Sequence, residues 1–236
     1  MSMDRALEEI RAGRFVLVFD FDDRERESDL TVASESVTWE HIRTMRKEAG
    51  GLVCTTTPYS VAKDIGLPFM ADVYWGGRGE YPVLGDMAPN DIPYDNTKSS
   101  FGLTINHRKT YTGITDRDRA LTISEYARTI FQDKPGREIE VELGKNFRAP
   151  GHVHLLNTSS RILRDRFGHT ELCTALMYLA GVKPSATICE MLGDDGGSRP
   201  KGEVLDFAER NGIPFVTGEE VKTAWYEYVD ANGLAL

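Results

Sequence analysis

The apolar run at residues 15–19 (FVLVF) constrains the fold of this chain more than any other stretch. A continuous apolar run of this length is typical of a strand that is buried on both faces of a sheet. The run ends abruptly in three aspartates, Asp20, Asp22 and Asp23. We therefore expect a central strand whose carboxyl end opens into a charged loop, anchored on its far side by the next apolar run at residues 30–33.

Further strands and helices alternate along the rest of the chain. Apolar runs predict strands at residues 52–55, 101–105, 139–141, 153–156, 187–192 and 213–216. Helical spacing, capping residues and glycine stops predict helices at residues 4–12, 38–49, 58–65, 115–131, 169–180, 200–211 and from 217 onward. This interleaving predicts an α+β or mixed α/β fold, a single domain over residues 1–236 with a mixed β-sheet core flanked by helices.

The stretch at residues 76–100 contains several glycines and prolines and has no clear periodicity. Loops of this length are uncommon inside compact domains unless they serve as lids or binding elements. We therefore expect a long, mobile surface loop here. The sequence leaves open whether this loop closes over a ligand.

Composition and charge exclude some classes of partner. The formal net charge is -9 and the pI is about 5.1, so the surface is expected to repel nucleic acid and anionic lipid, which bind basic surfaces. No apolar run reaches the length of a membrane span, and the first residues are too charged for a secretory signal. We expect a cytoplasmic protein with no nucleic-acid or membrane partner, whose three scattered cysteines stay reduced.

The segment RERESD, residues 24–29, supplies most of the charge in the loop after the first strand. Judged by residue types alone, it is a solvated loop. Its position favours a second interpretation, because ligands bind at the carboxyl ends of strands in many α/β sheets. In that case Glu25 could ligate a hard cation such as Mg²⁺, which commonly takes only one or two protein carboxylates.

The segment GHTE, residues 168–171, opens the helix predicted at residues 169–180. The amino end of a helix presents unpaired N–H groups and a partial positive charge, so a phosphate would bind there. The Thr170 hydroxyl and the nearby Arg166 would support it. The alternative is that Thr170 only caps the helix and that His169 is a turn residue.

Other reactive groups lie in or beside predicted strands. Glu190 stands among apolar residues, where a carboxylate is costly unless it is paired, so a structural salt bridge and a catalytic role explain it equally well. His152 and His154 follow a Pro-Gly turn, and this spacing fits either a metal site or one catalytic histidine beside an incidental one. Cys54 falls in a predicted buried strand and is expected to be a core residue.

Taken in order, these motifs resemble the 3,4-dihydroxy-2-butanone 4-phosphate synthase family of riboflavin biosynthesis, in its archaeal-type, single-function form. The resemblance spans nearly the whole chain. It rests on the blocks FDDRERESD, HIRTMRKEAGGLVCTT, NDIPYDNTKSSFGLTINHRKTYTGITDRDRALTI, PGHVHLL, RFGHTE and TICEMLGDDGG. It implies that the chain has the fold of that family.

The resemblance implies an enzyme that converts D-ribulose 5-phosphate into 3,4-dihydroxy-2-butanone 4-phosphate and formate, by metal-assisted enolisation, skeletal rearrangement and loss of carbon 4. It implies Mg²⁺ or Mn²⁺ as the cofactor, with two ions per site. It also implies a homodimer whose sites lie near the subunit interface. By the same resemblance, the metal ligands are Glu25 and His169.

Further residues receive roles from the resemblance alone. Those matched to catalytic positions are His152, Glu190, Asp29 and Glu27. Those matched to substrate-binding positions are Arg24, Glu25, Asp29, Thr112, Arg166, Gly168, His169, Thr170 and Glu190. Which group removes the first proton stays open among Asp29, Glu190 and His152.

Four residues depart from the pattern of many relatives: Arg26, Ser28, Tyr111 and Phe167. Relatives often have Asn in place of Arg26 and Gly in place of Ser28, which raises the question of whether the loop needs a positive φ at residue 28. Phe167 places a bulky ring beside the expected phosphate site. None of the four removes an expected ligand, so we expect an active enzyme.

Two other functions stay open. One is another metal-dependent sugar-phosphate lyase or isomerase that uses the same site, which would consume ribulose 5-phosphate without releasing formate. The other is a non-catalytic sugar-phosphate-binding protein. A degraded metal site would favour this last function, and the presence of both Glu25 and His169 argues against it.

Overall fold

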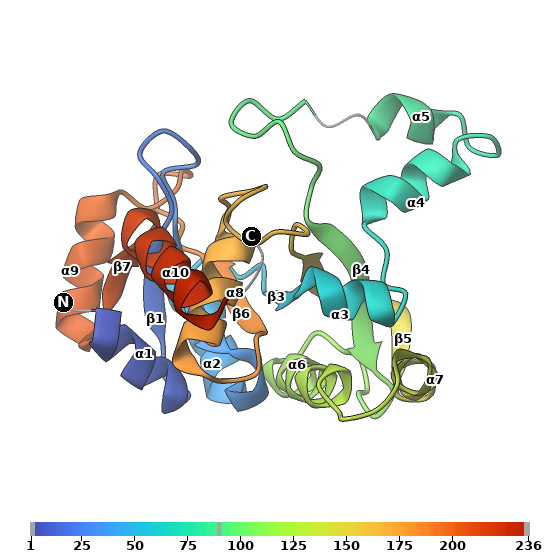
Figure 1. Ribbon diagram of the computed structural model, residues 1–236, viewed down its shortest axis with the longest axis horizontal. Coiled ribbons are helices and arrows are strands. Elements are labelled where there is room, and N and C mark those ends of the chain that lie inside the picture. The colour runs from blue at the N-terminus through green and yellow to red at the C-terminus, as the bar shows by residue number, and fades with distance from the viewer. Residues whose placement is uncertain (1–2, 89–90, 234–236) are drawn as a thin grey trace.

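The computed structural model describes residues 3–88 and 91–233, which form one mixed sheet with helices on both faces (Figure 1). The strands are β1 (Val16–Phe19), β2 (Ser28–Ala33), β3 (Cys54–Thr57), β4 (Phe101–His107), β5 (Phe147–Asn157), β6 (Ala186–Glu190) and β7 (Phe215–Thr217). Their order across the sheet is β4-β5-β3-β6-β2-β1-β7, with both parallel and antiparallel neighbours. The expected single domain with a mixed sheet core is confirmed.

The helices cover the sheet in two layers. They are α1 (Met3–Arg11), α2 (Trp39–Glu48), α3 (Tyr59–Asp64), α4 (Met70–Gly77), α5 (Val83–Met87), α6 (Asp116–Ile130), α7 (Gly136–Asn146), α8 (His169–Ala180), α9 (Lys201–Asn211) and α10 (Gly218–Asn232). Alternate residues of β1 belong to different cores: Val16 and Val18 pack with α1, α8 and α10, whereas Leu17 and Phe19 pack with α2, α6 and α9. The run at residues 15–19 is apolar throughout because it is covered on both faces.

The register of three neighbouring strands collects the acidic residues at one end of the sheet. β1 and β2 are antiparallel, with Phe19 opposite Ser28, so residues 20–27 form the loop between them. β6 runs antiparallel to β2 on the other side and places Glu190 directly opposite Asp29. The charged loop therefore lies at the carboxyl end of a central strand, as expected, and it has a second carboxylate-bearing strand beside it.

The strand expected at residues 139–141 is wrong, because these residues lie inside the helix α7. Glutamates alternate with apolar residues around Ile139 and Val141, which imitates the period of a strand. The helical period is the one that packs: Ile139 is buried, and Leu143, one turn later, rests against the same core. The backbone enters this helix at Pro135, which stands at its N-cap.

The loop expected at residues 76–100 is also wrong in part. Its first residues end α4, and it contains α5. Neither helix buries a residue, and Figure 1 shows both set apart from the sheet, so no apolar stripe marked them in the sequence. The described remainder, residues 78–82, 88 and 91–100, has no helix or strand. Its mobility stays a prediction.

Candidate active site

The loop at residues 20–27 is built around a buried carboxylate. Asp20 is 1% exposed, and its Oδ2 accepts the N–H of Glu25 at 2.9 Å while its Oδ1 accepts the N–H of Glu27 at 3.1 Å. The backbone turns at Arg26, whose φ is 61°. This left-handed region is adopted by Asn more readily than by most residues, so an arginine is an uncommon residue at this turn. RERESD is therefore a fixed turn and more than a solvated loop.

The same geometry answers the question about Ser28. Ser28 lies in β2, opposite Phe19, and the positive φ falls two residues earlier. Its hydroxyl is buried and has no hydrogen-bond partner among the described residues. Nothing in the structure explains why a serine stands at this position.

The RERESD and GHTE segments meet at Glu25 and His169. Glu25 Oε2 lies 3.1 Å from His169 Nδ1, across 144 residues of chain. The other ring nitrogen, Nε2, lies 3.3 Å from the Glu27 carbonyl oxygen and 3.7 Å from Asp29 Oδ1. His169 is the first residue of α8 and is buried, so the start of this helix fixes the ring against the loop.

Glu25 and His169 hold each other in their charged forms. Burial would raise the pKa of Glu25, but the hydrogen bond and charge of His169, together with Arg24, outweigh it and lower the pKa to about 2. Burial would lower the pKa of His169, but ionised Asp29, and then the hydrogen bond and charge of Glu25, outweigh it and raise the pKa to about 10. At neutral pH, where the raised pKa of Asp29 keeps that residue protonated, the charged partner of the imidazole is Glu25. In the metal-free protein these two residues form an ion pair at neutral pH.

Asp29 and Glu190 are cross-strand neighbours on β2 and β6. Asp29 is 1% exposed, and its Oδ1 has no hydrogen-bond partner in the part of the chain that the structure describes. Burial, and then the charge of Glu190, raise the pKa of Asp29 to about 8, although His169 opposes this shift. Burial also raises the pKa of Glu190. This pair therefore retains a proton near neutral pH, as groups that exchange protons with a ligand do.

The raised pKa of Asp29 predicts a pH-dependent stability. The folded state keeps the Asp29 proton up to about pH 8, whereas the unfolded chain loses it near pH 4, so wild-type stability falls as the pH rises between these values. Asp29→Asn removes this titration. We expect the difference in melting temperature between the variant and the wild type, both in EDTA, to grow by several degrees in favour of the variant as the pH rises from 5 to 8. For a chain of this length, each kcal/mol of stability corresponds to roughly 2–4 °C. A difference in melting temperature that stays constant from pH 5 to pH 8, measured by calorimetry, would contradict this prediction.

The donor atoms around this pair suit a divalent cation. Ligand atoms of Asp20, Glu25 and His169 all lie within 4.8 Å of one another. Both Asp20 oxygens already accept loop N–H groups, so Asp20 supports Glu25 and leaves the coordination to Glu25 and His169. The partnerless Oδ1 of Asp29 faces the same imidazole. Carboxylate oxygens with an imidazole fit Mg²⁺ or Mn²⁺, so the residues present fit the expected metal.

Two arginines, Arg24 and Arg166, border the carboxylates of the site. Three residues to which the sequence assigned no role contact these arginines. Arg24 Nη1 lies 2.9 Å from Glu25 Oε1, and its guanidinium lies 5.2 Å from the centre of the Tyr94 ring. Arg166 Nη1 donates to Glu171 Oε2 at 2.7 Å. Both arginines contact Asp95, which belongs to the segment at residues 91–100. Asp20 was visible in the sequence as the end of an apolar run. Tyr94, Asp95 and Glu171 lie in recognisable motifs, but nothing in those motifs indicates that they contact the arginines.

A cavity of about 320 Å³ opens beside the two arginines. Its walls are formed by Phe21, Asp23, Arg24, Tyr94, Asp95, Asn96, Asp165, Arg166, Phe167, Glu219 and Lys222. Phe167 packs edge-on against Phe21 at 6.2 Å between ring centroids, and the Lys222 ammonium lies 5.5 Å from the Phe167 ring. The bulky Phe167 therefore forms a wall of this cavity.

The amino end of α8 lies next to Arg166. Gly168 is the N-cap residue, and a Cβ at this position would collide with the Arg166 guanidinium. Glycine lets the arginine pass this close to the backbone, and a side chain here would displace the guanidinium from its present position. Thr170, in the first turn, is buried. The structure thus places Arg166, Gly168, His169 and Thr170 together at a helix amino end, the arrangement that suits an anion.

His152 and Thr112 stand apart from this cluster. β3 and β6 lie between β5, which carries His152, and β2, so roughly 14 Å of sheet separates His152 from the strand of Asp29. His152 is exposed, and its Nδ1 lies 3.0 Å from Asn106 Nδ2. The exposed Thr112 lies 3.5 Å from Asp118 through its hydroxyl. One chain therefore does not bring all the expected site residues together.

Cys54 and His154 occupy neighbouring strands. They are paired in register between β3 and β5. Cys54 is buried, as expected of a core residue, and burial raises the pKa of its thiol well above the usual range. His154 is half-buried, and burial lowers its pKa. Neither has a contact with the Glu25–His169 pair among the interactions of the described residues.

Comparisons of the sequence identify a family. A family model described as 3,4-dihydroxy-2-butanone 4-phosphate synthase matches residues 4–224. A protein of that name from Methanothermobacter thermautotrophicus is 44% identical over 227 residues, which is 96% of each chain. Another from Archaeoglobus fulgidus is 39% identical over 94% of this chain and 92% of its own.

Solved structures are similar throughout. A 3,4-dihydroxy-2-butanone 4-phosphate synthase in complex with two magnesium ions matches with a TM-score of 0.75, 25% identity and full coverage of both chains. The enzyme of that name from Candida albicans matches with a TM-score of 0.72 and 27% identity over 97% of each chain. Separately, none of the helices within residues 3–88 and 91–233 is long and apolar enough to cross a membrane.

Proposed function

Because this chain belongs to the 3,4-dihydroxy-2-butanone 4-phosphate synthase family, we propose that it converts D-ribulose 5-phosphate into 3,4-dihydroxy-2-butanone 4-phosphate and formate. The observation that carries the proposal is the approach of Glu25 Oε2 to His169 Nδ1, at 3.1 Å, beside the buried pair Asp29 and Glu190. Metal ligands and proton-exchanging groups then adjoin one another at the carboxyl end of a strand.

Glu25 and His169 would hold the divalent metal, Mg²⁺ or Mn²⁺. The related structure in complex with two magnesium ions supports a divalent metal here, and two ions per site is part of this proposal. Bound metal supplies a Lewis acid that lowers the cost of negative charge on the substrate oxygens. Asp20 keeps Glu25 in place by accepting its N–H, and the Glu27 carbonyl orients the imidazole through Nε2.

The remaining residues of the chain bind the substrate and move its protons. Arg166, Gly168 and Thr170 would hold the phosphate at the amino end of α8, and Arg24 would contact the sugar. The pKa of Asp29 is raised to about 8 and that of Glu190 is also raised, so one of them would accept the proton removed on enolisation and the other would donate during the rearrangement. The carboxylate of Glu27 is half-buried, and burial raises its pKa, so it would serve as a further proton donor.

A second copy of the chain would complete the site. His152 and Thr112 match expected site positions, yet the sheet separates His152 from Asp29 by two intervening strands. A homodimer that sets the β4–β5 edge of one subunit against the Glu25 loop of the other would bring both residues in. This arrangement agrees with a family whose sites lie near the subunit interface, and we propose it for this chain.

The reaction is tested with purified protein, D-ribulose 5-phosphate and Mg²⁺. We expect formate release that stops in EDTA and returns when excess Mg²⁺ is added. Turnover without formate would instead indicate an isomerase, and binding without turnover would indicate a sugar-phosphate-binding protein. Either result with metal-replete protein would overturn the proposed reaction.

A further inference from the structure

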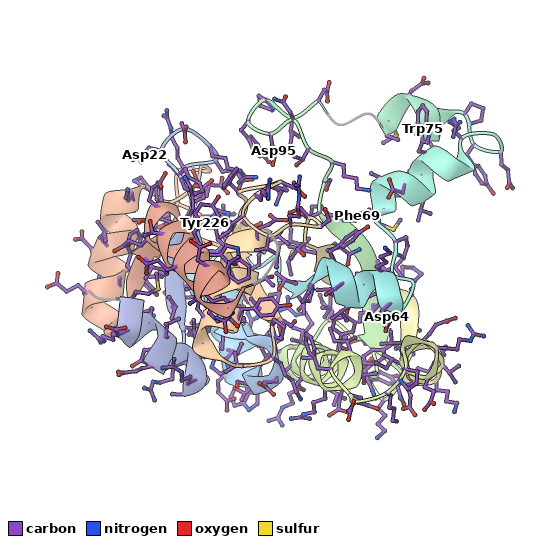
Figure 2. The ribbon with its side chains drawn as sticks, viewed as in Figure 1. Asp22, Asp64, Phe69, Trp75, Asp95 and Tyr226 are labelled. Atoms are coloured by element: carbon purple, nitrogen blue, oxygen red, sulfur yellow. The ribbon has the colours of Figure 1, made fainter. Side chains whose placement is uncertain are left out.

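Asp95, in the segment at residues 91–100, contacts both of the arginines that border the site, Arg24 and Arg166. Its Oδ2 accepts a hydrogen bond from Arg24 Nη2 at 3.1 Å and lies 3.1 Å from Arg166 Nε. Its Oδ1 accepts from the N–H and the hydroxyl of Thr97, at 2.8 and 2.6 Å. The side chain is 8% exposed, and Figure 2 shows its loop and the Asp22 loop rising at the same end of the molecule.

These contacts close a chain of alternating charges. It runs from Asp20 to Arg24, then through Asp95 to Arg166 and Glu171. The two outer carboxylates are completely buried, so each arginine is held at its far side by a fixed partner. Among the ion pairs of the described residues, Asp95 is the only carboxylate that contacts both arginines. Without its charge, two guanidinium groups would face each other with less compensation and would move apart.

We propose that Asp95 is a positioning residue that sets the separation of the Arg24 and Arg166 guanidinium groups, and through them the fit of a sugar phosphate. This inference rests on the proposed function, in which Arg24 contacts the sugar and Arg166 the phosphate. Asp95 acts through the arginines, because a carboxylate in contact with a phosphate dianion would repel it. All three residues line the 320 Å³ cavity, so the bridge forms part of the wall that a ligand would meet.

In this proposal the segment at residues 91–100 holds Asp95 in place between the two arginines. It has no helix or strand, yet its Thr97 fixes one Asp95 oxygen and leaves the other directed at the arginines. Contacts made equally in the ground state and the transition state change KM and leave kcat nearly constant. Loss of the bridge should therefore weaken substrate binding more than it slows the chemistry.

The test compares Asp95→Asn, Asp95→Glu and the control Asp72→Asn with wild type. Asp72 pairs with Lys98 near the same segment but is 60% exposed and outside the arginine cluster. We expect Asp95→Asn to raise the KM for ribulose 5-phosphate about tenfold, with kcat changed less than about threefold. Asp95→Glu keeps the charge and should recover part of the loss. Asp72→Asn should behave as wild type.

Binding of inorganic phosphate, measured by calorimetry on the same four proteins, provides a readout that needs no turnover. We expect Asp95→Asn to weaken it by a similar factor. An unchanged or tighter phosphate affinity in Asp95→Asn would overturn the inference, as would a loss confined to kcat. Absence of formate from the wild-type protein would overturn the proposed function alone, and the phosphate comparison would still decide the role of Asp95.

Discussion

Glu25→Gln is expected to reduce kcat for ribulose 5-phosphate by about a thousandfold or more while leaving the fold intact. Glutamine keeps the shape of the side chain but loses the charge that pairs with His169 at 3.1 Å and that would hold the metal. The fold should survive because the loop is anchored by Asp20 and the backbone, which the substitution leaves in place.

The control for this variant is Asp22→Asn. Asp22 lies in the same loop, but its carboxylate is 84% exposed and contacts only Lys201 among the ion pairs of the described residues. Both variants should keep a cooperative melting transition, and only Glu25→Gln should lose metal-dependent protection against heat. Wild-type turnover in Glu25→Gln would remove this residue from the metal site.

Mixing two inactive variants should restore activity. His152→Ala is expected to lose most turnover, because it removes a group that the partner subunit would supply. When His152→Ala and Glu25→Gln chains exchange subunits, half of the dimers are mixed, and each mixed dimer contains one site with both native residues. Equal amounts should therefore recover roughly a quarter of wild-type activity.

The result depends on which chain supplies His152. If His152 and Glu25 of one chain served the same site, every site in the mixture would lack one of them, and no activity would return. A pair of variants that belong to one chain's cluster, Glu25→Gln with His169→Ala, provides the matched control. This second mixture should stay inactive, because Glu25 and His169 contact each other within a single chain.

The sequence predicted the sheet better than the parts of the chain that leave it. The run at residues 15–19 is apolar on both faces, and this signal holds whatever the neighbouring strands are. The period of α7 was hidden because glutamates alternate with its apolar residues. The helices α4 and α5 bury no residue, so the usual signal of a helix, one apolar stripe, is absent from them.

For the site, the sequence identified candidate residues, and the structure showed which of them contact one another. Glu25 and His169 were each recognisable from their motifs, but only the fold brings them to 3.1 Å across 144 residues. Asp20 and Asp95 work by accepting hydrogen bonds from particular partners, which residue types do not reveal. Glu171 belongs to the GHTE motif, yet its contact with Arg166, at 2.7 Å, depends on the path of the loop before α8.

The measurement that tests the central claim most directly follows carbon 4 of the substrate. Purified protein with Mg²⁺ is given ribulose 5-phosphate labelled at carbon 4, or at carbon 1 in a parallel reaction. We predict one formate for each substrate consumed, with the label in formate only in the first reaction. Unlabelled formate from the substrate labelled at carbon 4, or consumption of substrate without formate, would contradict the assignment of this chain as the synthase.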